Sequence, residues 1–160
     1  MKKISVGTLI LSLLVPLLVG GTSAALSATG MVMYGNMNKP PLSPPVWVFS
    51  VAWTILYFMM GLASYYIIVS EAETYSKAMA LIVYAIQLVM NFMWSIMFFN
   101  WGSFLAAFIW LIIMWVIVIL CAIRFYRISR KATYLLFPYI VWLGFAAYLN
   151  MGTYVLNTNI

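Results

Sequence analysis

Residues that most enzymes use for chemistry are almost absent from this chain. Its 160 residues include no histidine, one cysteine and only two Asp or Glu side chains. Zinc sites and charge-relay nucleophiles need several such residues, so the sequence excludes ordinary metal-dependent and hydrolytic catalysis and predicts no metal site. A bound haem would have no histidine ligand, which leaves only Tyr, Met or Cys. The single cysteine, Cys121, has no partner within the chain for a disulfide.

Charged residues of any kind are also scarce. They make up 6% of the chain, whereas 67% of the residues are hydrophobic. Soluble domains contain about 25% charged residues, and a transmembrane helix needs roughly 20 mostly apolar residues. The composition therefore predicts an all-α integral membrane protein, a bundle of five transmembrane helices that forms a single domain over residues 1–160. The approximate spans are 4–26, 46–70, 78–99, 104–123 and 133–156.

The first apolar run has a second interpretation. Two lysines precede it and small residues follow it at 22–28, a pattern that also resembles a secretory signal with a cleavage site. Removal of this segment would leave four spans. We interpret the run as a retained helix.

The few cations predict how the chain is oriented. With five spans, Lys39 is the only cation on one side, and the positive-inside rule makes the opposite, basic side cytoplasmic. The N-terminus is then cytoplasmic and the C-terminus outside. The net charge of +6 reflects this topology and contact with anionic membrane lipid rather than nucleic acid, because the cations sit beside membrane helices. The basic side holds Lys2, Lys3, Lys77, Arg124, Arg127, Arg130 and Lys131.

Four of the six prolines lie in one short stretch, residues 39–47, just before the second span. Proline fixes φ, so the stretch predicts a stiff loop. Ser43 can cap the following helix, with Pro44 at its first position. An ordinary helix start would explain an isolated proline pair. We favour a stiff lid over a binding site, because the loop opens a span rich in Trp and Tyr.

Polar residues inside the helices fall on single faces. In the third span they follow i, i+4, i+7, i+8 and i+11 spacing, which is one side of a helix. Amides facing lipid are costly, so this face is predicted to point inward, either to bond neighbouring helices or to orient a ligand. The residues of this face are Gln87, Asn91, Trp94, Ser95 and Phe98.

Similar faces occur on other spans and predict a cavity. Trp53 and Tyr57 lie one turn apart in the second span, as do Trp110 and Met114 in the fourth. Aromatic residues at helical spacing usually pack, but three inward faces that combine an aromatic with a small or amide residue would line a mostly apolar ligand site. The fifth span contributes Tyr139, Trp142, Ala146, Asn150 and Thr153.

The first span carries Gly20-Gly21 followed four residues later by Ala24-Ala25. Small residues at this spacing allow two membrane helices to approach closely. The pattern indicates a homodimer formed through this helix.

Four sequence blocks together resemble the tryptophan-rich sensory protein / translocator protein family, also called the peripheral-type benzodiazepine receptor family. They are Lys39–Pro45 with Trp47, the stretch 51–57, the third-span face from Gln87 to Phe99, and Pro138–Asn150. The blocks occur in the family order across the second to fifth spans, and the resemblance is to a bacterial member.

This resemblance implies a five-helix bundle, commonly a homodimer, that binds porphyrin, haem, some sterols and isoquinoline-type ligands under the first loop. A tetrapyrrole would be a ligand and not a cofactor. Proposed roles in the family are tetrapyrrole sensing or transport, light-dependent porphyrin degradation, and scaffolding in stress responses. The ligand-binding residues map to Tyr34, Pro44, Trp53, Tyr57, Asn91, Trp94, Leu111, Trp142 and Ala146.

One departure from the family pattern bears on catalysis. Members proposed to degrade porphyrin use two tryptophans, of which one matches Trp142 and the other falls on Met33. We therefore predict a receptor or carrier with no catalytic residue. A porphyrin-degrading enzyme using Trp142, or a non-catalytic scaffold, is the alternative.

Overall fold

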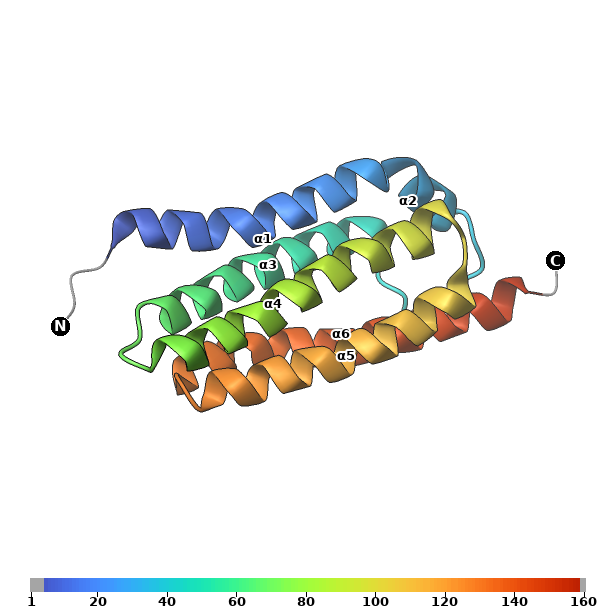
Figure 1. Cartoon of the computed structure of the whole chain (residues 1–160). Coiled ribbons are helices and arrows are strands. Elements are labelled where there is room, and N and C mark those ends of the chain that lie inside the picture. Colours follow the sequence, from blue (N-terminus) through green and yellow to red (C-terminus); the bar gives the residue numbers. More distant parts are fainter. Residues whose placement is uncertain (1–4, 159–160) are drawn as a thin grey trace.

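The computed structural model describes residues 5–158 and consists of long helices that run alternately up and down (Figure 1). Five of them are long and apolar enough to cross a membrane. They confirm the predicted fold class, and the chain is an integral, multi-pass membrane protein. The long helices are α1 (Val6–Leu26), α3 (Val46–Ile68), α4 (Thr74–Ser95), α5 (Phe104–Tyr126) and α6 (Arg130–Asn157).

Two short elements were not expected from the sequence. The helix α2 (Ala28–Gly35) follows α1 directly, and the π-helix η1 (Ile96–Asn100) continues α4. The start of α3 also differs from the expectation for Ser43. Pro45 is the residue that precedes the helix, and the Ser43 hydroxyl donates to the carbonyl of Pro40 at 2.7 Å instead of capping.

The helix α1 lies on one side of the bundle and packs mainly on α3 (Figure 1). Their backbones approach closely at Gly61. A Cβ atom there would lie 2.8 Å from both Leu13 Cα and the carbonyl oxygen of Ser12. Only a residue without a side chain fits this crossing, since the neighbouring atoms are backbone. The other close pairs are α5 with α6, α3 with α6, and α4 with α5.

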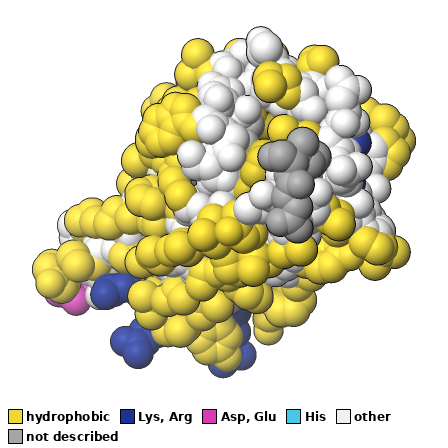
Figure 2. Space-filling model, turned by 90° about the vertical axis from the view of Figure 1, so that its right-hand side faces the viewer, with side chains coloured by type: hydrophobic (Ala, Val, Ile, Leu, Met, Phe, Trp, Pro, Cys, Tyr) yellow, Lys and Arg dark blue, Asp and Glu magenta, His cyan; other side chains and the backbone are white. Residues whose placement is uncertain are grey.

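The two ends of the bundle differ in charge. The start of α4, the end of α5 and the start of α6 meet at one end, which we call the basic end. Its described cations are Lys77, Arg124, Arg127, Arg130 and Lys131. Seen from the opposite end, where α2 lies, most of the surface is hydrophobic or uncharged, and charged side chains show mainly at the lower and left margins of the view (Figure 2). Large apolar side chains are exposed along every long helix, as a lipid-facing surface requires.

The crossing at Gly61 provides a test of how α1 is held. We expect Gly61→Val to lower the free energy of unfolding in detergent by about 1–3 kcal/mol, because the new side chain pushes α1 away from α3. Gly7→Val on α1 is the matched control, since a Cβ at Gly7 meets nothing within 4 Å. Equal unfolding curves for the two variants would show that the α1–α3 contact adds no stability.

Candidate ligand-binding cavity

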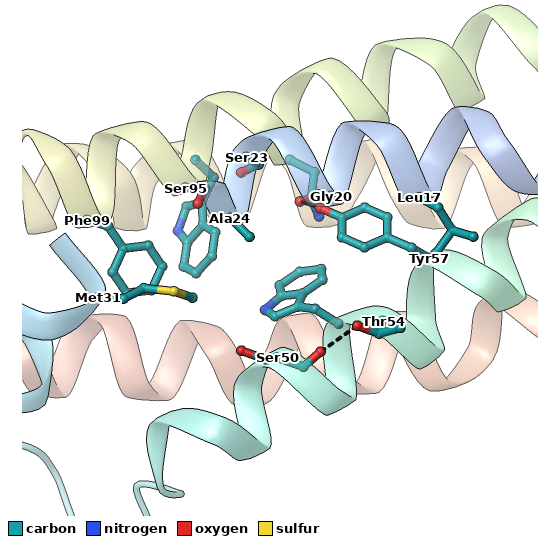
Figure 3. Close-up of a pocket in the computed structure, with 14 residues that line it drawn as sticks. Leu17, Gly20, Ser23, Ala24, Met31, Ser50, Thr54, Tyr57, Ser95 and Phe99 are labelled. Atoms are coloured by element: carbon teal, nitrogen blue, oxygen red, sulfur yellow. Dashed lines mark hydrogen bonds between the residues drawn. The ribbon is translucent and has the colours of Figure 1, made fainter. Parts of the chain in front are cut away.

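A cavity of about 320 Å³ lies between α1, α3 and α4. In Figure 3, Met31 and Phe99 lie at one end of the cavity, and Leu17 and Tyr57 lie at the other. The walls come from helices that are far apart in sequence. The lining residues are Leu17, Gly20, Gly21, Ser23, Ala24, Met31, Ser50, Trp53, Thr54, Tyr57, Asn91, Trp94, Ser95 and Phe99.

Aromatic rings form most of the wall opposite α1. The ring of Trp53 lies 5.7 Å from that of Tyr57 and 6.1 Å from that of Trp94, both tilted against it. Trp53 also meets the ring of Trp142 edge to face at 6.4 Å. Tilted and edge-to-face pairs at these distances are favourable arrangements. The cluster gives the cavity a stiff apolar face.

A chain of hydrogen bonds runs behind this aromatic wall. Tyr57 donates to the side-chain oxygen of Asn91 at 2.6 Å, and the Asn91 amide donates to Tyr139 at 2.9 Å. Tyr139 in turn donates to the side-chain oxygen of Gln87 at 3.0 Å. All four side chains are buried. The chain joins α3, α4 and α6, and it confirms that the polar face of the third span points inward.

Asn91 lines the cavity and retains hydrogen-bonding capacity. An amide has two N–H groups and two lone pairs on its oxygen, and Asn91 uses one of each within the described part of the chain. Trp94 is more fully occupied, since its indole N–H donates to Asn150 at 3.2 Å. Ser95 shares a hydrogen bond with Ser27 at 3.0 Å. Asn91 is the only amide side chain among the lining residues, and its unused N–H and lone pair could bond a polar atom of a ligand.

Gly20 allows the aromatic wall to come close to α1. A Cβ at this position would lie 2.2 Å from the ring of Tyr57, so any larger residue would displace the ring. Gly21 and Ala24, which also line the cavity, are exposed at its edge. Gly20 thus serves a contact within the chain, whereas a Cβ at Gly21 would meet nothing within 4 Å.

Four of the nine ligand-binding residues mapped from the family lie together on this cavity: Trp53, Tyr57, Asn91 and Trp94. Tyr34 and Ala146 flank another, smaller void of about 10 Å³. Its other lining residues are Phe49, Trp94, Phe98, Phe99, Leu149 and Asn150. The other three residues line neither space. Leu111 is fully buried in the core on α5, Trp142 packs behind Trp53, and Pro44 lies in the first loop.

The proline-rich loop docks on α6. Pro40 packs against Gly152, where a Cβ would lie 2.5 Å from the proline ring. Tyr148 donates to the carbonyl of Pro41 at 2.7 Å, and Asn157 exchanges two hydrogen bonds with the backbone of Asn38. No residue of the loop lines the larger cavity.

Tyr34 and Lys39 connect α2 to this loop. The ammonium group of Lys39 lies 5.5 Å from the centre of the Tyr34 ring and donates to the carbonyl of Gly35 at 2.7 Å. Burial raises the pKa of the Tyr34 hydroxyl above its ordinary value, so the group stays neutral. Lys39 is thereby held by its neighbours in the chain.

The contribution of α1 to the cavity was missed from the sequence, together with Met31, Ser50, Thr54 and Phe99. The only available signal was the run of small residues at 20–24, which was interpreted as a helix contact. Small residues opposite a large aromatic face are also how a cavity forms.

The sequence profile of the TspO/MBR family matches residues 12–156. The tryptophan-rich protein TspO of Archaeoglobus fulgidus is 36% identical over 150 residues, which cover 93% of this chain and 96% of that protein. The protein of the same name from Chlorobaculum tepidum is 36% identical over 124 residues, 78% of each chain. The translocator protein of Ovis aries is 37% identical over 123 residues, 76% of this chain and 72% of the relative.

The buried hydrogen bonds among Tyr57, Asn91, Tyr139 and Gln87 allow a prediction about stability. Tyr139→Phe removes one hydroxyl and leaves the Asn91 amide and the Gln87 oxygen without that partner. We expect the free energy of unfolding to fall by about 1–3 kcal/mol, as measured by denaturant titration in detergent. Tyr134→Phe on the same helix is the control, because Tyr134 is exposed. Identical midpoints would mean that the buried chain adds no net stability.

Proposed function

This chain belongs to the TspO/MBR family, and from that membership we propose that it is a membrane receptor or carrier for porphyrin- or haem-like tetrapyrroles, which it binds in the cavity between α1, α3 and α4. Isoquinoline-type ligands would share the site. The role that follows is sensing or transport of the ligand. The proposal extends the resemblance described above to the residues that line this cavity.

The observation that carries the proposal is a cavity with a broad aromatic wall and a single well-placed amide. Trp53, Tyr57 and Trp94 supply flat surfaces against which a conjugated ring can pack. Asn91 offers one free N–H and one free lone pair to a polar atom of that ring. Ligand sites in proteins commonly combine apolar walls with few polar groups in this way.

The size and position of the cavity suggest how a tetrapyrrole would lie. Its volume of about 320 Å³ is near the lower limit for small-molecule sites. Ser50, Thr54 and Ala24 on its edge are exposed between α3 and α1. One edge of the macrocycle would fit against the aromatic wall while its polar substituents lie toward this side opening. An apolar ligand would then reach the site from the bilayer.

We also propose an orientation for the chain in the membrane and a mode of dimer formation. Placing the basic end in the cytoplasm leaves the N-terminus inside, the C-terminus outside and the cavity in the outer half of the membrane. A homodimer through α1 is compatible with the exposure of Gly21 and Ala25 on that helix. Membrane lipid would cover the remaining apolar surface.

The side opening gives a direct test of the binding site. Thr54→Phe places a bulky ring at the edge of the cavity, and we expect it to weaken protoporphyrin binding by about tenfold, since even one lost contact of 1.4 kcal/mol has that effect. Titration of the porphyrin absorbance shift in detergent measures the affinity. Ile55→Phe is the matched control, because Ile55 is exposed on the same helix and lines no described cavity.

If Thr54→Phe binds protoporphyrin as tightly as the wild type, the ligand does not occupy this cavity. The small void beside Tyr34 and Ala146 would then be the place to examine with Ala146→Phe. A loss of affinity in Thr54→Phe and Ile55→Phe alike would indicate binding to the outer surface of α3.

The enzymatic alternative is less well supported by the geometry. Met33, at the position of the first tryptophan of the degrading pair, is exposed and does not line the cavity, whereas Met31 does. We expect illumination to bleach protoporphyrin no faster with the protein than in detergent alone. Absorbance decay under constant light is the measurement. Fast decay that disappears in Trp142→Phe would favour the enzyme over the receptor.

A further inference from the structure

A second cavity lies toward the basic end, also between α1, α3 and α4. Its volume is about 280 Å³, and it shares no lining residue with the first cavity. Along α3, the tight crossing at Gly61 separates the two. Its lining comes from the N-terminal half of α1, the C-terminal part of α3 and the first half of α4. Its apolar walls come from Leu11, Val15, Ile68 and Leu81.

Two buried hydroxyl groups at this cavity have no hydrogen-bond partner among the described residues. They are Ser12 Oγ and Tyr84 Oη, on side chains that are 6% and 5% exposed. A third hydroxyl in the lining, that of Ser64, lies near Tyr84 and donates to the carbonyl of Gly61 at 2.9 Å. The Tyr84 ring packs 5.9 Å from that of Phe125, so packing restricts the position of its hydroxyl. Burial of a hydroxyl without a partner is unfavourable, and an oxygen atom of a bound molecule would remove that cost.

Lys77 does not line this cavity, but its ammonium group bonds to the carbonyl of Ile68, which does. Lys77 precedes Leu81 and Tyr84 by one and two turns, so the three lie on one face of α4. The ammonium group donates to the carbonyls of Ile68 at 3.4 Å and Ser70 at 3.2 Å, at the end of α3. An ammonium has three N–H donors, so one is left for an anionic group.

From these groups we propose that the second cavity binds the acyl chain of a membrane lipid. The chain lies against the apolar walls, its carbonyl oxygen accepts hydrogen bonds from Tyr84 and Ser12, and an anionic group faces Lys77. A tetrapyrrole is a poor match, because Tyr84 is the only aromatic residue in the lining. The site is independent of the proposed tetrapyrrole site.

The same acyl chemistry has two sources, a phospholipid ester and a free fatty acid. Native mass spectrometry of the whole chain in detergent separates them when phosphatidylglycerol and oleate are titrated in turn. We expect saturable binding of one molecule per chain for at least one of the two. Absence of saturable binding for both phosphatidylglycerol and oleate would overturn the proposal.

Two variants tie that binding to the cavity. Tyr84→Phe keeps the ring and removes only the hydroxyl, and we expect the dissociation constant to rise about three- to tenfold, as for one lost hydrogen bond. Ser12→Leu fills the space and should reduce binding further. The control is Tyr134→Phe, an exposed tyrosine near the basic end on α6. Affinities for Tyr84→Phe and Ser12→Leu equal to that of the wild type would place the lipid elsewhere and overturn the assignment.

Charge selectivity tests the role of Lys77. Phosphatidylglycerol should bind more tightly than phosphatidylcholine of the same chains, and Lys77→Gln should remove that preference. A preference that survives in Lys77→Gln would overturn this part of the assignment. Protoporphyrin titration of Tyr84→Phe should give the wild-type affinity, so failure of the lipid site and failure of the tetrapyrrole site are distinguishable.

Discussion

Polar side chains inside a bilayer find no water to replace a missing partner, and this constraint governs how α3, α4 and α6 fit together. Tyr57, Asn91, Tyr139 and Gln87 satisfy one another across the three helices. Each such bond contributes only about 0.6 kcal/mol on average in membrane proteins, yet an orphaned amide or hydroxyl is costly. The rotation of each helix about its axis is therefore restricted to one that keeps the whole chain paired. The same rotation brings Trp94 to Asn150.

The helix α1 takes no part in that chain and is held in a different way. It packs mainly on α3, and at Gly61 the two backbones approach so closely that shape decides the fit. At its C-terminal end, Asn100 donates to the carbonyl of Leu26 at 3.0 Å. Small residues on α1 face large aromatic side chains on α3 and α4, so the interface is not filled everywhere. Both cavities discussed above have α1 as one wall. In this bundle, buried hydrogen bonds fix α3, α4 and α6 relative to one another. The interface with α1 is less completely filled and leaves space for ligands.

Local periodicity explains which parts of this structure the sequence predicted. The spacing of Gln87, Asn91 and Trp94 defined an inward face on its own, and the length of the apolar runs predicted the five spans. Local periodicity could not predict how the loop docks on α6, because the hydrogen bonds between Asn38 and Asn157 join residues more than a hundred positions apart. The π-helix η1 and the position of Phe99 at the cavity depend on packing as well. The separation of Tyr34 and Ala146 from the cavity follows from aromatic rings that fill the space between.

The loop before α3 shows how stiffness and docking work together. Proline lowers the entropy that the unfolded chain loses on ordering, and Leu42 adopts a left-handed backbone with φ of 67°, which is unfavourable for a residue with a side chain. The contacts of Pro40 with Gly152 and of Tyr148 with Pro41 offset that strain. These anchors lie on α6, the helix that also carries Tyr139 of the buried chain. A loop tied to the most constrained part of the bundle is ill suited to swing open. Access to the aromatic-walled cavity is then from the side between α1 and α3, where Ser50 and Thr54 are exposed.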